Sequence, residues 1–243
     1  MLSIRGVFML SYVIAGLVFV FLLFLFSRFR PAPTKKVTDD LYAVRCGFVN
    51  FYVLKTDNGV IQFDTGMSPF FAKRGLQKLG ISPDVITHIF LTHTDYDHVG
   101  GLAAFPQAMR YISKPEEQMI NGKTARRGVL HNRKLSNYHL LEDGDTVSVG
   151  NYTIKVHFVP GHTPGSVVYV IGNRYLVSGD LLRVSRKKEI IPFLWFMNMN
   201  HRQVIESMKK VQSVIRNVEY VLTGHTGFCN TKSNLELSYR GDN

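Results

Sequence analysis

Cysteine is scarce in this chain of 243 residues, which contains only Cys46 and Cys229. The two lie far apart, and neither belongs to a Cys-x-x-Cys pair or to another spacing typical of metal ligands. Their number leaves the redox compartment undetermined and gives no basis for a cysteine-ligated metal site. We interpret both as small buried residues, with a single disulfide between them as the open alternative.

Several other signatures are missing. The sequence has no internal repeats, no low-complexity tract, no nucleophile elbow around a serine and no recognisable nucleic-acid-binding module. The formal charge is +11, and beyond residue 36 the basic residues outnumber the acidic ones by 24 to 18 without clustering. We therefore expect no nucleic-acid partner. The basic excess favours an anionic substrate or an anionic membrane surface instead.

Acidic residues are absent from residues 1–36, and residues 7–26 carry no charge at all. As a helix, this apolar run would be about 30 Å long, the thickness of the hydrocarbon core of a bilayer. A cleaved signal peptide is the alternative, but its apolar core is usually only about 7–15 residues long and ends at a small-x-small cleavage site. No such site follows residue 26, so we predict an uncleaved transmembrane helix that contacts the lipid bilayer.

This helix divides the chain into a flank at 1–6, a membrane span at 7–26, a linker at 27–37 and a folded domain at 38–243. Basic residues are denser after the span than before it, which predicts a single-pass membrane protein with its domain in the cytoplasm. Pro31 and Pro33 make the linker a stiff spacer.

Short strands alternate with helices in the domain, which predicts an α/β fold. Two segments have apolar residues at helical spacing, 69–79 and 201–216. The expected strands are 41–46, 50–54, 60–63, 85–91, 146–149, 152–159, 166–171, 175–177 and 219–222.

Histidine and aspartate follow four of these strands. His93, Asp95, Asp97 and His98 come after 85–91, His162 after 152–159, Asp180 after 175–177, and His225 after 219–222. Four ligand-type side chains within six residues are too costly to bury without a partner. Strand ends that converge at one edge would bring all seven side chains to a common point. We therefore predict a metal site built from these residues.

Five short blocks in this order resemble those of the metallo-β-lactamase superfamily, over about residues 64–225. They are Phe63-Asp64-Thr65-Gly66, the cluster from His93 to His98, the loop from Pro160 to Ser166, Ser178-Gly179-Asp180, and Thr223-Gly224-His225. The resemblance implies a four-layer αβ/βα sandwich, in which two sheets lie face to face, helices cover the outside and metals bind at one edge.

The resemblance also implies two divalent metal ions. One would be held by His93, Asp95 and His162, and the other by Asp97, His98 and His225, with Asp180 bridging and Asp64 supporting the ligands by hydrogen bonds. The superfamily usually has histidine where this chain has Asp95. A carboxylate there makes the site harder and shifts its preference toward iron or manganese, which are the alternatives, but zinc stays the first expectation.

Such a site predicts a metallohydrolase, in which metal-activated hydroxide attacks a small substrate and Asp97 is the catalytic residue that orients the nucleophile. The loop at 160–166 resembles that of glyoxalase II-like and lactonase-like members, which favours an ester, lactone or thioester. A phosphodiesterase is the first alternative, supported by the basic segment 121–139. The second alternative is a non-hydrolytic, membrane-tethered metal-binding or redox protein, which Asp95 keeps open.

Substrate-binding residues and the oligomeric state stay unassigned at this level. The basic segment 121–139 is either a clamp for an anionic group or a solvated connection. The apolar segment 190–199, which holds the only tryptophan, Trp195, is a pocket wall, a membrane-touching patch or part of the core. The histidines outside the five blocks are interpreted as structural or surface residues, namely His88, His131, His139, His157 and His201.

Overall fold

The computed structural model describes residues 4–232 and 236–239, and the chain divides into two units, Met1–Arg30 and Pro31–Asn243. In the first unit, helix α1 (Ile4–Arg28) includes the predicted span. Among the described residues, however, no helix combines the length and the apolarity that crossing a membrane requires. The predicted transmembrane helix at 7–26 is therefore not supported. The predicted flank at 1–6 lies partly outside the described residues.

The second unit contains a seven-stranded sheet in the order β1 to β7. Strands β1 to β4 pair in antiparallel fashion, whereas β4 to β7 are parallel. The strands are β1 (Lys35–Lys36), β2 (Leu41–Cys46), β3 (Val49–Thr56), β4 (Gly59–Phe63), β5 (Ile86–Phe90), β6 (Met109–Ser113) and β7 (Tyr138–Leu141).

A six-stranded sheet has the order β15-β14-β11-β10-β9-β8, in which β11 and β14 are parallel and the other neighbours antiparallel. Its strands are β8 (Thr146–Val149), β9 (Tyr152–Phe158), β10 (Val167–Ile171), β11 (Tyr175–Gly179), β14 (Tyr220–Thr223) and β15 (Gly227–Asn230). A separate hairpin pairs β12 (Leu182–Val184) with β13 (Ile190–Pro192).

Side-chain alternation along the strands separates the apolar residues into cores. In β3, Tyr52 and Leu54 join the core between the two sheets, whereas Phe51 and Val53 join a core on the opposite face. In β10, Tyr169 points into the intersheet core. Because successive side chains of a strand point to opposite faces, each continuous apolar run supplies two layers of packing at once.

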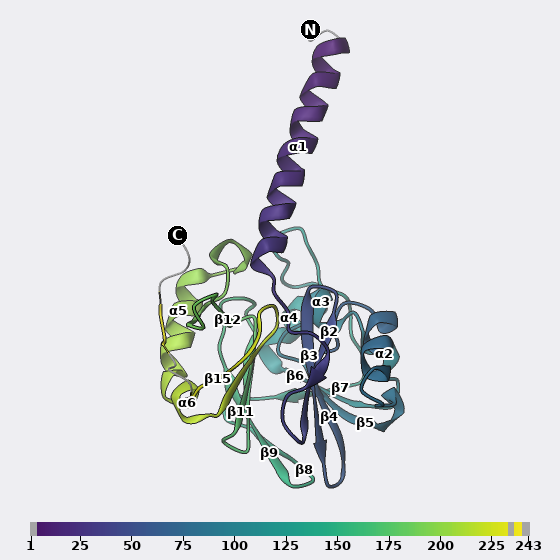
Figure 1. The fold of residues 1–243 in the computed structure, drawn as a ribbon, viewed down its shortest axis with the longest axis vertical. Helices are drawn as coiled ribbons and strands as arrows, with labels where there is room; N and C mark the ends of the chain where they lie inside the picture. Colours follow the sequence, from purple (N-terminus) through teal and green to yellow (C-terminus); the bar gives the residue numbers. More distant parts are fainter. Residues whose placement is uncertain (1–3, 233–235, 240–243) are drawn as a thin grey trace. The chain divides into compact units, whose positions relative to one another are not determined.

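Helices cover the outer face of each sheet. Helix α2 (Pro69–Gln77) packs Leu76 into the outer core of the first sheet. Helices α5 (His201–Lys210) and α6 (Gln212–Asn217) pack Met208 and Ile215 against the second. The resulting order of helix, sheet, sheet and helix is visible in Figure 1. It confirms the mixed α/β sandwich predicted from the sequence.

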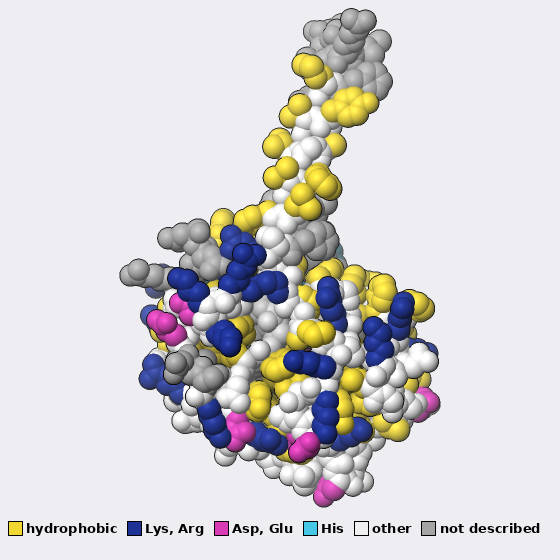
Figure 2. Space-filling view, in the orientation of Figure 1, with side chains coloured by type: hydrophobic (Ala, Val, Ile, Leu, Met, Phe, Trp, Pro, Cys, Tyr) yellow, Lys and Arg dark blue, Asp and Glu magenta, His cyan; other side chains and the backbone are white. Residues whose placement is uncertain are grey.

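Two short helices lie nearer the site, α3 (Tyr96–Val99) and α4 (Glu117–Ile120). Figure 2 shows basic side chains scattered over the visible face of the second unit rather than gathered in one patch.

Cys46 is buried and Cys229 is half-buried, and both are free thiols, so the disulfide that the sequence left open is not formed.

Candidate metal centre

Strand ends deliver the predicted ligands. His93 follows β5, Asp95 is the N-cap residue of α3, and Asp97 and His98 lie within that helix. His162, Asp180 and His225 follow β9, β11 and β14. The structure brings all seven side chains together, in three overlapping groups whose ligand atoms lie within 4.8 Å of one another.

The first group contains His93, Asp95 and His162. The Oδ2 atom of Asp95 lies 3.2 Å from Nε2 of His162 and 3.5 Å from Nε2 of His93. The two imidazoles are almost fully buried, whereas the Asp95 side chain keeps 16% of its exposure. A carboxylate oxygen and two imidazole nitrogens therefore face the same point from the side that opens to solvent.

The second group contains Asp97, His98 and His225. Oδ2 of Asp97 lies 3.2 Å from Nε2 of His225 and 3.8 Å from Nε2 of His98. Asp180 lies between the two groups, with Oδ2 3.4 Å from His162 and 3.2 Å from His225, and with Oδ1 3.4 Å from His98. This is the position that a bridging carboxylate requires.

Three buried polar atoms at this point have no hydrogen-bond partner among the described residues: Nε2 of His93, Nε2 of His98 and Oδ1 of Asp180. Buried polar atoms are rarely left without a partner, because desolvating them is costly. The three belong to side chains that also supply metal-ligand groups. Imidazole nitrogen and carboxylate oxygen are ligands of zinc and of other divalent ions, so the residues present fit a metal centre.

The carboxylates of the centre attract positive charge. Burial lowers the pKa of His225, but Asp180 and Asp97 outweigh it and raise that pKa to about 10. Burial likewise opposes the charged form of His98, yet Asp180 and Asp64 hold its pKa well above the ordinary value. A cluster that holds cationic imidazoles in this way is electrostatically suited to a divalent cation.

Asp64 supports the centre from the end of β4. Its carboxylate accepts hydrogen bonds from the backbone N–H of Thr92 at 2.8 Å and from the Thr92 hydroxyl, and its Oδ2 lies 2.8 Å from Nδ1 of His98. A carboxylate at Nδ1 fixes the ring so that Nε2 faces the centre. Nδ1 of His225 lies 3.0 Å from the carbonyl oxygen of Phe48, which orients that ring similarly.

Glu116 is a residue that the sequence did not single out. Its buried carboxylate accepts hydrogen bonds from the N–H and the hydroxyl of Thr94, the hydroxyl of Thr163 and the N–H of Gly165. Burial raises the pKa of Glu116. The residue ties the loop of His93 to the loop of His162 and so fixes the spacing between them. It lies outside the five blocks, and no local pattern marks it.

Glycine at position 224 is required by the close approach of two ligands. A Cβ atom there would lie 2.6 Å from Oδ1 of Asp180 and 2.8 Å from Cε1 of His98. Carbon contacts this short force one partner to move. The Thr223-Gly224-His225 block therefore supplies room for its neighbours as well as a ligand.

A pocket of about 460 Å³ opens beside Asp95. Its walls come from both segments that the sequence left open, since Arg126, Arg127 and Leu130 face residues 196–199 across it. Within 190–199, the residues at 190, 191, 193 and 194 are core, whereas Trp195 is 65% exposed. The apolar segment is thus part core and part pocket wall, and the basic segment contributes arginines to the same pocket.

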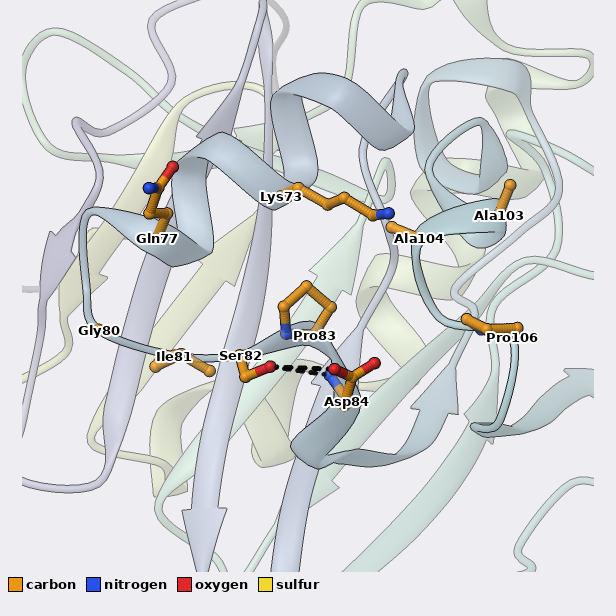
Figure 3. Close-up of a pocket in the computed structure, with 10 residues that line it drawn as sticks. All are labelled: Lys73, Gln77, Gly80, Ile81, Ser82, Pro83, Asp84, Ala103, Ala104 and Pro106. Carbon is orange, nitrogen blue, oxygen red and sulfur yellow. Dashed lines mark hydrogen bonds between the residues drawn. The ribbon is translucent and has the colours of Figure 1, made fainter.

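A larger pocket of about 530 Å³ lies elsewhere, between α2, residues 80–84 and residues 103–106 (Figure 3). Its titratable lining residues are Lys73 and Asp84, and the carboxylate of Asp84 accepts a hydrogen bond from the hydroxyl of Ser82. No group of potential metal ligands among the described residues includes any of its lining residues. Of the two pockets, the smaller one includes a candidate ligand, Asp95, in its lining.

None of the five histidines interpreted as structural or surface residues joins the ligand groups among the described residues. One of them still contacts the centre indirectly. Asn198 places Oδ1 3.0 Å from Nδ1 of His162 and Nδ2 2.9 Å from Nδ1 of His201. His201 therefore helps to hold Asn198 against a candidate ligand.

Known proteins of similar sequence include two named hydrolases. The chain is 30% identical over 142 residues to the probable metallo-hydrolase YqgX of Bacillus subtilis, covering 55% of this chain and 65% of that protein. It is 38% identical over 112 residues to a hydroxyacylglutathione hydrolase of Gloeobacter violaceus, covering 44% and 38%. The chain thus spans less than two thirds of the length of these relatives.

Among solved structures, a metallo-beta-lactamase family protein of Thermus thermophilus, TTHA1429, superposes with a TM-score of 0.65 at 19% identity, over 81% of this chain and 76% of that one. Likeness at this identity concerns the fold alone. The sequence profile of the metallo-beta-lactamase superfamily matches residues 44–225, from β2 to the last predicted ligand. This chain belongs to the metallo-beta-lactamase superfamily.

Proposed function

We propose that this metallohydrolase cleaves the ester, lactone or thioester bond of a small substrate that carries an apolar acyl group. The observation that carries the proposal is that Asp95 belongs both to a group of candidate metal ligands and to the lining of a pocket. The similarity to a hydroxyacylglutathione hydrolase supports an acyl compound as substrate.

The donor set favours two divalent ions, with zinc first and iron or manganese as the alternatives that Asp95 leaves open. When bound, such ions lower the pKa of water and polarise the bond to be cleaved. His93, Asp95 and His162 would hold one ion and Asp97, His98 and His225 the other, with Asp180 between them.

Asp97 is suited to the role of a base. Its side chain is 20% exposed, whereas the histidines that it approaches are almost completely buried. A carboxylate at the open side of the centre is able to orient an incoming water and to accept its proton. Asp180, at 4% exposure, lies deeper and serves to hold the ligands apart at a fixed spacing.

The apolar rim of the pocket favours an acyl chain. Of the residues that line the pocket, Leu130 is 61% exposed and Phe196 and Met197 are partly exposed. Trp195, which precedes Phe196 in the chain, is 65% exposed. Large apolar side chains left in solvent at the edge of a pocket are typical of a binding surface. Their burial by a substrate is therefore favourable, and a short polar substrate would gain less from this site.

The test is a substrate screen. The purified chain, loaded separately with zinc, manganese and iron, is assayed against chromogenic esters, lactones, thioesters and phosphodiesters. Asp97→Ala is expected to lower turnover by at least about a hundredfold. Asp84→Ala, which removes a carboxylate from the other pocket, is the matched control and is expected to keep full activity.

Two results would overturn the proposal. Turnover confined to phosphodiesters would favour the alternative that the arginines of the pocket support. Stoichiometric iron with redox-active spectra and no turnover of any substrate would favour a non-hydrolytic redox protein.

A further inference from the structure

The guanidinium group of Arg126 lies within the first ligand group. Its Nε donates to Oδ1 of Asp95 at 2.8 Å, and its Nη2 lies 2.5 Å from Oδ2 of the same carboxylate. Nη2 also lies 2.8 Å from Nε2 of His162. The side chain is anchored further by a hydrogen bond from Nη1 to the carbonyl oxygen of Met197 at 2.7 Å.

These contacts use the atoms that a metal ion would need. An ion held by Asp95 and His162 lies about 2.0–2.2 Å from a carboxylate oxygen and an imidazole nitrogen. Nη2 already contacts both Oδ2 and Nε2, so it fills the space between them. A guanidinium and a divalent cation cannot occupy that space together, because they overlap and because both are positively charged.

The second ligand group is arranged differently. The ion-pair partners that the structure gives Asp97 and Asp180 are the imidazoles of His98, His162 and His225, with which they would share an ion. Imidazoles lose a proton readily when a metal binds, whereas a guanidinium stays charged throughout the physiological range. The two positions of the centre are therefore unequal before any metal arrives.

The carboxylate of Asp95 accounts for the position of Arg126 within the first ligand group. Histidine at this position would offer a neutral ring with no negative charge to pair with a cation, whereas the carboxylate forms a two-point ion pair with the fork of Arg126. The side chain of Arg126 is only 18% exposed, so the pair is held in partly desolvated surroundings.

We infer that Arg126 competes with one metal ion for the position formed by His93, Asp95 and His162. The chain then binds one divalent ion tightly at Asp97, His98 and His225, and a second ion only when the guanidinium moves away. Arg126 lies between α4 and β7 with no regular helix around it, so its side chain is able to leave without unwinding an element.

The test measures metal binding and needs no substrate, so it stands whether or not the proposed hydrolase activity is found. Zinc ion is titrated into the metal-free chain against a chelator of known affinity, and bound zinc is measured by mass spectrometry. The chain is expected to bind one equivalent tightly and a second at least about tenfold more weakly. Arg126→Met, which keeps an unbranched side chain but removes the guanidinium group and its charge, is expected to bring the two zinc affinities together.

Arg127→Met is the matched control. Arg127 lines the same pocket but donates to the carbonyl oxygen of Phe196 at 3.1 Å rather than to a ligand, so the two zinc affinities are expected to stay as in the unchanged chain. Asp95→His gives a second test that keeps a ligand and removes the partner of Arg126. It is expected to raise the affinity for the second zinc ion, as Arg126→Met does. Circular dichroism checks that each variant is folded.

Two equivalents of equal affinity in the unchanged chain would overturn the inference. An unchanged or weaker second equivalent in folded Arg126→Met would also overturn it, since Arg126 would then only support Asp95 as a hydrogen-bond partner.

Discussion

Oδ2 of Asp64 lies 2.8 Å from Nδ1 of His98, so a carboxylate at the end of β4 fixes the ring of a candidate ligand in helix α3. Asp64→Asn keeps the shape of the side chain but removes its charge. We predict that the affinity for zinc falls by about 10- to 100-fold, as is typical for the loss of such a partner. Titration against a competing chelator measures it, with Asp84→Asn as the control. Unchanged affinity would show that the contact does not orient His98.

Glu116 receives four hydrogen bonds that join the two ligand loops. Glutamine would present an amide group to two of these donors, so Glu116→Gln leaves buried donors without acceptors. We predict a loss of about 2 to 4 kcal/mol in the free energy of unfolding of the metal-free chain. Denaturant unfolding measures this loss. Glu206→Gln, at an exposed helix pair, is the control, and an equal effect in both variants would contradict the role given to Glu116.

Gly224 tests how tightly the ligands are packed. Gly224→Ala would place a methyl group against Asp180 and His98, so we predict weaker zinc binding with little change in secondary structure. Gly16→Ala, where a Cβ meets nothing within 4 Å, is the control and is expected to bind zinc as the unchanged chain does. Full affinity in Gly224→Ala would mean that the ligands are free to shift.

Asp40, which is not one of the candidate ligands, is expected to make the stability of the fold depend on pH. Partial burial raises the pKa of Asp40, but hydrogen bonds from Thr38, Tyr152 and Tyr175 outweigh burial and hold that pKa below the ordinary value of 3.8. A lowered folded-state pKa stabilises the fold above the ordinary value, and this contribution is lost as the pH falls through the lowered one. Asp40→Asn should therefore lower the free energy of unfolding by about 1 to 2 kcal/mol at neutral pH and by less at an acid pH below 3.8.

Urea unfolding of the unchanged chain and of the Asp40→Asn variant at the two pH values checks this prediction. If the variant loses the same free energy of unfolding at neutral and at acid pH, the introduced asparagine disturbs packing, and the loss of the charge is not the cause.

The strands nearest the site were predictable because their sequence signals are local. A continuous apolar run marks β10, and mainly apolar, aromatic and β-branched residues mark β5 and β11, each of which is followed by candidate ligands. Strand β7 was missed because it is short and lies at the edge of its sheet, where two of its four residues are exposed. The single helix expected at 201–216 is interrupted at Val211, whose backbone leaves the helical region without a proline or glycine to signal it.

For the candidate metal centre, the sequence predicted the ligands but not all of the residues that contact them. Its seven candidate ligands could be singled out because they lie in short blocks just after predicted strands, and their division between two ions followed from the family resemblance. Glu116 and Arg126 act through contacts with residues more than 20 positions away. No pattern along the chain distinguishes them from other glutamates and arginines, because their roles arise only when distant loops meet.

The most direct test of the candidate metal centre is a crystal structure of the zinc-loaded chain, with anomalous scattering recorded on both sides of the zinc absorption edge. We predict a zinc peak about 2.0–2.2 Å from Asp97, His98 and His225. A folded crystal of zinc-saturated protein with no peak among these side chains would contradict it.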